Sequence, residues 1–139
     1  MSRETPTLAV GREALVVFED RRDASVLRCL RPGFRHCFCL TGGGTRWTLC
    51  DPLKGRLALA AADGLGVAEL AGHFVAGGGR VLLGPVADGG APDRRLGLRP
   101  LTCVEIVKAS VGLRAASVLT PHQLYRRLLR GAAFVELAA

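Results

Sequence analysis

The sequence predicts an α+β domain in which an antiparallel sheet of about five to six short strands packs with two or three helices. Short apolar runs between glycine- and proline-rich turns fill residues 11–86 and indicate strands. Helix-capping patterns and apolar residues at helical spacing fill the last third of the chain. Because the strands mostly precede the helices instead of alternating with them, the order favours the α+β class.

Composition indicates one domain over residues 1–139. The chain is 49% hydrophobic and 22% charged, which supports a core and excludes a disordered or collagen-like protein. Its charge-free runs are far shorter than the roughly 20 residues that cross a bilayer, so we expect no membrane span. The N-terminus has no basic head followed by an apolar stretch, so we expect no signal peptide and a cytoplasmic site of synthesis.

The chain is basic, with 19 Lys+Arg against 12 Asp+Glu and a formal charge of +7. The arginines are scattered and aromatic residues make up only 5% of the chain. Single-strand binding needs aromatic side chains within basic surroundings, so nucleic acid is not the expected partner. A basic surface of this kind can attract an anionic polymer or an acidic partner.

Five cysteines without a CxxC pair indicate reduced thiols. A zinc site built from His36, Cys37, Cys39 and Cys50 is conceivable, but alternate residues of a strand point to opposite faces and would separate His36 from Cys37 and Cys39. We therefore expect no metal and no cofactor. By the same alternation, Cys37 and Cys39 should be dispensable for any activity centred on His36.

Local patterns place the secondary structure. Two helices have a Thr cap followed three residues later by Glu or Gln, the capping box, and each ends before a glycine. The capping box alone accounts for Glu105. Helices are expected at 103–111 and 121–130, a loop at 88–95, a helix or strand at 67–74, and strands at 14–18, 26–30, 34–40, 46–51, 56–62, 80–86 and 134–137.

One histidine lies in an otherwise apolar row of the strand at 34–40. If the apolar faces of this strand and the next coincide in a hairpin, Leu40 opposes Trp47 and His36 opposes Asp51. Opposed side chains have Cβ atoms about 4.5–5.5 Å apart, close enough for an imidazole N–H to reach a carboxylate. This register leaves a six-residue loop over 41–46.

These residues have the chemistry of a nucleophilic site. Cys103 opens a helix, where free N–H groups and the helix dipole lower a thiol pKa. His36 is the candidate general base, Asp51 its orienting group, and the backbone N–H of Val104 a donor to an oxyanion. Each residue also has a structural interpretation, as a core histidine or a small cysteine. Trp47 is either a wall of the substrate cleft or a core aromatic.

The order His36, Asp51, Cys103 resembles the circularly permuted branch of the papain-like superfamily, which includes lecithin retinol acyltransferase and small bacterial and phage amidase-like hydrolases. Those proteins place a His on an early strand, a polar residue on the next strand and a Cys at the start of a later helix. Thr102-Cys103-Val104-Glu105 is similar to their Asn-Cys-Glu-His motif, with Thr in place of Asn. The segments FRHCFCL, WTLCDP and TPHQLY are also similar to small proteins of phages, prophages and gene transfer agents.

The resemblance implies a permuted papain-like fold and a cysteine hydrolase of the amidase or peptidase type. Its substrate would be a peptide or an acyl compound, with cell-wall peptide as one candidate. Cys103 would attack the carbonyl, His36 would transfer the proton and Asp51 would orient the imidazole. The alternative is a non-catalytic structural protein of a phage tail or tail tip, which would place the chain in a virion beside other phage proteins.

Overall fold

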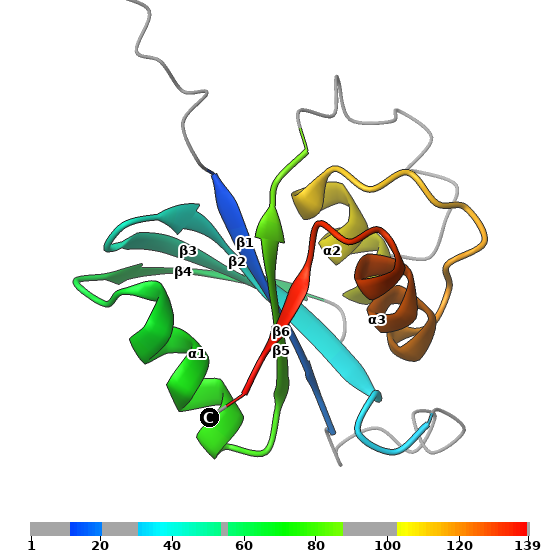
Figure 1. Cartoon of the computed structure of the whole chain (residues 1–139), viewed down its shortest axis with the longest axis horizontal. Coiled ribbons are helices and arrows are strands. Elements are labelled where there is room, and N and C mark those ends of the chain that lie inside the picture. Colours follow the sequence, from blue (N-terminus) through cyan, green and yellow to red (C-terminus); the bar gives the residue numbers. More distant parts are fainter. Residues whose placement is uncertain (1–11, 21–30, 54–55, 88–102, 139) are drawn as a thin grey trace, which may run out of the picture.

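The computed structural model describes residues 12–20, 31–53, 56–87 and 103–138. Six strands form one antiparallel sheet in the order β4-β3-β2-β1-β5-β6, and three helices pack on it (Figure 1). The α+β prediction is confirmed. The strands are β1 (Glu13–Glu19), β2 (His36–Gly43), β3 (Arg46–Leu53), β4 (Arg56–Asp63), β5 (Arg80–Pro85) and β6 (Val135–Leu137); the helices are α1 (Val67–Ala76), α2 (Cys103–Val111) and α3 (Pro121–Arg130).

Most predicted elements lie within two residues of their expected ranges. The ambiguous segment at 67–74 is helix α1, and the two C-terminal helices have the expected bounds. In α3, both hydrogen bonds of the capping box form between Thr120 and Gln123. The predicted strand at 26–30, the loop at 88–95 and the Thr102 cap lie outside the described residues.

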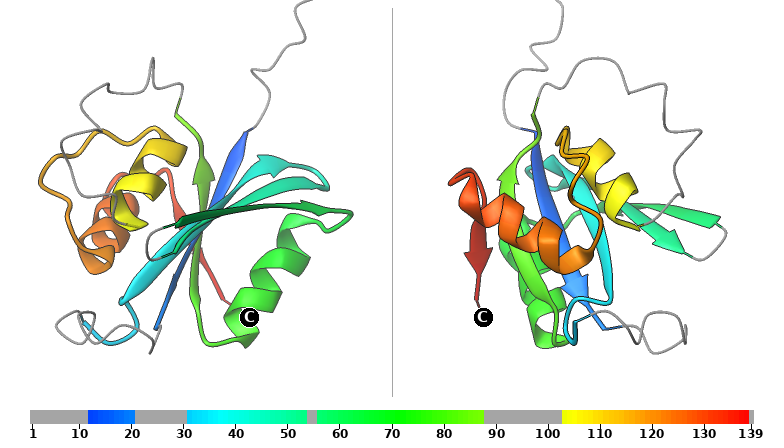
Figure 2. Two further views of the ribbon diagram at one scale, coloured as in Figure 1. Left: turned by 180° about the vertical axis from the view of Figure 1, so that it is seen from behind. Right: turned by 90° about the vertical axis from the view of Figure 1, so that its right-hand side faces the viewer.

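The helices cover opposite faces of the sheet. Helix α1 lies against one face, while α2 and α3 lie on the other (Figures 1 and 2). Side chains of β1 alternate between the two layers: Val16 and Phe18 join the α2–α3 core, whereas Leu15 and Val17 join the α1 core. β1 is therefore apolar on both faces because both are covered. None of the helices within the described ranges is long and apolar enough to cross a membrane.

The β2–β3 hairpin differs from its predicted register. Leu40 pairs with Leu49, and Trp47 pairs with Gly42 instead of Leu40. The strands continue to Gly43 and Arg46, so the expected six-residue loop is a two-residue turn. A shift of two residues keeps every side chain on its original face, so the apolar pattern cannot distinguish the two registers.

A glycine makes the observed register possible. At Gly42 a Cβ atom would lie only 2.1 Å from the carbonyl oxygen of Arg46, much closer than any side chain permits. The hairpin strands therefore approach closely at this pair. The consequence for the site is that His36 lies two positions away from the residue directly opposite Asp51, as a diagonal neighbour within reach of a long side chain.

Candidate active site

His36 and Asp51 form a close polar pair. The imidazole Nε2 lies 2.8 Å from the carboxylate Oδ1, and the two side chains are only 7% and 14% exposed. β2 supplies the histidine at its first residue, and β3 supplies the aspartate near its end. Such a short contact, largely shielded from water, holds the imidazole ring in one orientation.

Cys103 is the first residue of α2, the helix that packs on β2 and β3. Its pKa is lowered from the usual 9.0 to about 5, chiefly because the Cys37 side chain hydrogen-bonds to the sulfur. A hydrogen bond with His36 and the charge of that imidazole lower the pKa further, whereas burial opposes the shift. At neutral pH the sulfur is therefore a thiolate, the form of cysteine that attacks carbonyl carbons.

The structure thus brings together His36, Asp51 and Cys103, the three residues predicted from the sequence. Asp51 engages Nε2 of His36, and the same imidazole lowers the pKa of the Cys103 thiol. A histidine held between a carboxylate and an ionised thiol has the geometry of a nucleophile, base and orienter. The three come from one strand pair and the helix that packs on β2 and β3.

Cys37 departs from the expectation for it. Strand alternation predicts that Cys37 and His36 are separated, yet both hydrogen-bond to the Cys103 sulfur. His36 is the first residue of β2, and its ring stacks on Phe38 with the centroids 6.1 Å apart. The pKa of Cys37 itself is raised by burial and by the neighbouring Cys103, so its thiol keeps the proton that it donates.

A second pair of thiols lies further along the same strands. Cys39 and Cys50 are directly opposed on β2 and β3, and Cys39 is fully buried against α2. Burial raises the pKa of Cys39 to about 12; a hydrogen bond with Ser110 opposes this, and Cys50 adds to it. Cys39 is thus an inert core thiol at neutral pH.

The backbone N–H of Val104 is the predicted donor to an oxyanion. Its side chain is 1% exposed and packs into the core between α2 and the sheet. Its N–H belongs to the first turn of α2, where amide groups have no acceptor within the helix. An oxyanion formed at a carbonyl attacked by Cys103 would meet this partial positive charge.

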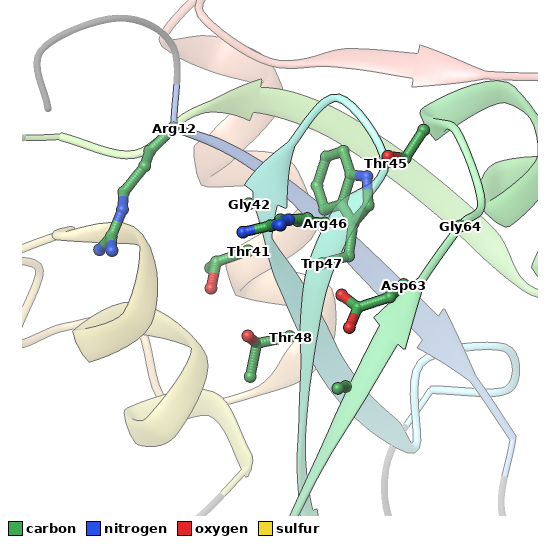
Figure 3. A pocket seen from close by; sticks show the side chains of 10 residues that line it. Arg12, Thr41, Gly42, Thr45, Arg46, Trp47, Thr48, Asp63 and Gly64 are labelled. Atoms are coloured by element: carbon green, nitrogen blue, oxygen red, sulfur yellow. The ribbon is translucent and has the colours of Figure 1, made fainter.

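Trp47 does not lie beside Cys103. It is 1% exposed in the core cluster on the α1 side, and its Nε1 donates to the carbonyl of Gly44 over 3.1 Å. It lies four positions before Asp51 on β3, roughly 13 Å along a strand. Its indole instead borders a pocket at the turn end of the β2–β3 hairpin, shown in Figure 3. The core interpretation of Trp47 is the one that the packing supports.

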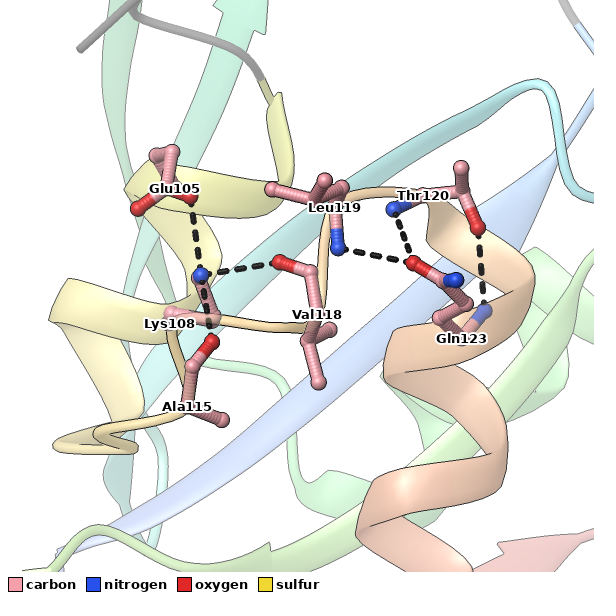
Figure 4. A network of polar contacts seen from close by, with 7 residues as sticks. All are labelled: Glu105, Lys108, Ala115, Val118, Leu119, Thr120 and Gln123. Atoms are coloured by element: carbon pink, nitrogen blue, oxygen red, sulfur yellow. Dashed lines mark hydrogen bonds and ion pairs between the residues drawn. The ribbon is translucent and has the colours of Figure 1, made fainter.

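Sequence reasoning missed a buried ion pair on α2. Lys108 is 3% exposed and its Nζ lies 2.8 Å from the Glu105 carboxylate (Figure 4). The same ammonium donates to the carbonyl oxygens of Ala115 and Val118, each over 2.9 Å. Glu105 therefore has a structural partner besides any role in capping. The spacing of an acid three residues before a lysine was a signal for this pair.

No group of three or more His, Cys, Asp or Glu side chains suitable for a metal ion occurs in the described part of the chain. Comparison with known proteins identifies no matching family model, no matching curated protein and no matching solved structure. The chemistry of the site therefore rests on its own geometry.

Proposed function

We propose that this protein is a cysteine hydrolase of the amidase or peptidase type. The observation that carries the proposal is the His36–Asp51 pair at 2.8 Å together with Cys103, whose pKa is lowered to about 5 by Cys37 and by this imidazole. Perturbed thiols beside an oriented imidazole are concentrated at nucleophilic sites. A permuted papain-like architecture, and a substrate such as cell-wall peptide, are parts of the same proposal.

The reaction follows from the geometry. The Cys103 thiolate attacks the carbonyl carbon of an amide or ester, and the developing oxyanion lies near the N–H of Val104. As the carbon–nitrogen or carbon–oxygen bond breaks, protonated His36 gives its proton to the leaving group. The acyl group now forms a thioester with Cys103. Neutral His36 then removes a proton from water, which attacks the thioester and releases the acid and the thiolate.

Asp51 acts on the imidazole in both steps. Its carboxylate holds Nε2, which keeps the imidazole in one orientation and stabilises the imidazolium that pairs with the thiolate. Asp51 does not need to change its own protonation state in either step. This role predicts that the orientation of His36, more than the presence of a negative charge alone, limits the rate.

The first test is the pH dependence of Cys103 alkylation by iodoacetamide, read by peptide mass spectrometry. The wild type should be half-ionised near pH 5, and His36→Ala should move this midpoint upward and slow the reaction at pH 6. His73→Ala is the matched control, because His73 is exposed on α1. Alkylation that begins only above pH 8, or that is no faster than at Cys50, would refute an activated nucleophile.

Turnover is tested with p-nitrophenyl acetate. The acetyl group should transfer to Cys103 with release of p-nitrophenolate, which gives a burst and an acetylated peptide in the mass spectrum. Cys103→Ala should abolish both signals, whereas Cys50→Ala should keep them. An activated thiol without acyl transfer to any ester or peptide amide would favour the alternative, a structural protein that retains the site.

A further inference from the structure

A second site lies on the α2 side of the sheet, at the end of β2 opposite to His36. It is a pocket of about 550 Å³, whose lining includes Arg12, Thr41, Arg46, Thr48 and Asp63. Figure 3 shows Arg12 and Arg46 on either side of Thr41, with the hydroxyls of Thr41 and Thr48 nearby. Arg12 immediately precedes β1, and Arg46 is the first residue of β3.

The charged side chains of this pocket form no ion pair with the described part of the chain. Arg12 and Arg46 are both exposed and make no ion pair among the described residues. Asp63 pairs with Arg46 in the β3–β4 register, but no ion pair joins their side chains. Two guanidinium groups against one carboxylate leave a net charge of +1 on the lining. Such a pocket suits one carboxylate better than a polyanion.

An exposed strip of sheet connects the pocket to the thiol. The β3–β4 register pairs Thr48 with Ala61 and Cys50 with Leu59, two pairs that follow one another on the face that α2 partly covers. Thr48 and Ala61 are exposed, and Leu59 is 65% exposed although it is a large apolar residue. From Cys37 to Thr41 the strand advances by four residues, about 13 Å, which an extended peptide of roughly four residues spans.

From this arrangement we infer that the Arg12–Arg46 pocket binds a carboxylate of the substrate, three to four residues from the bond that Cys103 attacks. The proposal rests on the proposed function and names its substrate class: an acidic or carboxy-terminal peptide lying across β3 and β4. Guanidinium groups pair with carboxylates through parallel hydrogen bonds, and the threonine hydroxyls supply further donors. Leu59 and Ala61 offer apolar contact to the intervening residues.

The test uses chloroacetyl-alanine peptides of one to five residues, each made with a free carboxylate and as the carboxamide. The Cys103 thiolate displaces chloride and forms a thioether, so the rate reports how well the peptide is held. We expect the acid and the amide to react alike at one residue, and the acid to react at least fivefold faster at three or four residues. Arg12→Gln/Arg46→Gln should remove this preference, and Arg127→Gln, an exposed change on α3, should keep it.

Two controls separate the outcomes. Equal rates for acid and amide at every length, or a preference that survives Arg12→Gln/Arg46→Gln, would overturn the pocket while leaving the thiol chemistry intact. Iodoacetamide measures that chemistry independently, and its rate should be the same in the wild type and in the double variant. If Cys103 is inert to iodoacetamide, the proposed function fails instead.

The pocket can also be measured without the thiol. Acetyl-trialanine with a free carboxylate should shift the amide NMR signals of Thr41 and Thr48 in Cys103→Ala, and the carboxamide should not. Absence of these shifts would overturn the inference whatever Cys103 does. Inorganic phosphate is the competing anion. If it shifts the same signals at lower concentration than the peptide acid, the pocket is a phosphate site and the carboxylate proposal is wrong.

Discussion

Cys103 is the first residue of α2 and Cys39 lies on the strand beneath this helix, yet the two thiols have opposite acid–base properties. The pKa of Cys103 is about 5, whereas that of Cys39 is about 12. Cys39 is fully buried and Cys103 is half-buried, and in both residues burial raises the pKa, so burial does not explain the low pKa of Cys103. The difference lies in their neighbours: Cys103 faces donors that stabilise a thiolate, and Cys39 faces the thiol of Cys50 in an apolar layer.

The position along α2 explains part of this contrast. Cys103 is the first residue of the helix, where N–H groups are unpaired and the dipole is positive. Cys39 lies beneath the C-terminal half, beside Ser110, whose hydroxyl also donates to the carbonyl of Ile106 over 2.9 Å. A reactive thiol therefore needs a position at a helix start and a proton donor beside it. The number of residues between the two cysteines indicates neither of these.

The largest expected effect is the difference in reactivity between these two thiols. At pH 7 their pKa values imply ionised fractions that differ by about 10⁵, partly offset because a more acidic thiol is a weaker nucleophile. We expect iodoacetamide to modify Cys103 at least about 100-fold faster than Cys39. Peptide mass spectrometry of one sample measures both rates. Comparable rates would contradict the difference between the two pKa values.

Stability should depend on pH in opposite ways for the two residues. Cys103 is ionised in the native state down to about pH 5, whereas an unfolded thiol binds its proton near 9.0. Unfolding between these values takes up a proton, so the contribution of Cys103 is complete above pH 9 and is lost as the pH falls through 5. Its slope is at most about 1.4 kcal/mol per pH unit.

Cys39 has the reverse sign, because its native pKa is raised. Its contribution is present below pH 9 and is lost as the pH rises toward 12. Urea unfolding at pH 5.5, 7.0 and 8.5 tests both statements. The stability difference between the wild type and Cys103→Ala should grow with pH, while the difference for Cys39→Ala should stay constant. A constant difference for Cys103→Ala would contradict the lowered pKa.

Lys108 tests whether the packing of α2 keeps Cys39 inert. Lys108→Met removes the ion pair with buried Glu105 and the ammonium hydrogen bonds to the carbonyls of Ala115 and Val118, of which the Ala115 carbonyl keeps the bond from the Val118 N–H. Breaking one partner of a buried ion pair costs about 3–5 kcal/mol, so we expect a loss of about 3 kcal/mol in the free energy of unfolding. Cys39 should also become more accessible to alkylation as α2 loosens.

Urea unfolding measures the first effect, and mass spectrometry of alkylated Cys39 the second. Arg127→Met is the control, because Arg127 is exposed on α3 and its loss should change stability by less than about 0.5 kcal/mol. A Lys108→Met protein as stable as the wild type would show that the buried pair does not hold the helix.

The smallest effect concerns the donor to the Cys103 sulfur. Cys37→Ala removes the hydrogen bond that contributes most to the low pKa of Cys103, so the alkylation midpoint should rise by about 1 to 2 pH units. Cys37→Ser keeps a donor and should stay near the wild-type midpoint. An unchanged midpoint in Cys37→Ala would show that Cys37 is dispensable, as strand alternation predicts.

Local patterns in the sequence predicted the α+β class and the faces of the strands, and they gave His36, Asp51 and Cys103 as candidate residues. Periodicity of two assigned His36 and Asp51 to one face, and the position of Cys103 after Thr102 predicted a helix start. These features depend on neighbouring residues, so they can be read from a single chain. The capping box of α3 belongs to the same class of local signal.

Tertiary packing sets the β2–β3 register, the partners of Cys103 and the place of Trp47. The register depends on the close approach at Gly42, which a pattern of faces cannot express because a two-residue shift preserves it. The contact of Cys37 with Cys103 depends on where α2 begins relative to β2, a distance of 66 positions in the sequence. Sequence patterns report on residues that are close together in the chain. The pKa of a side chain depends instead on the groups that tertiary packing places around that side chain.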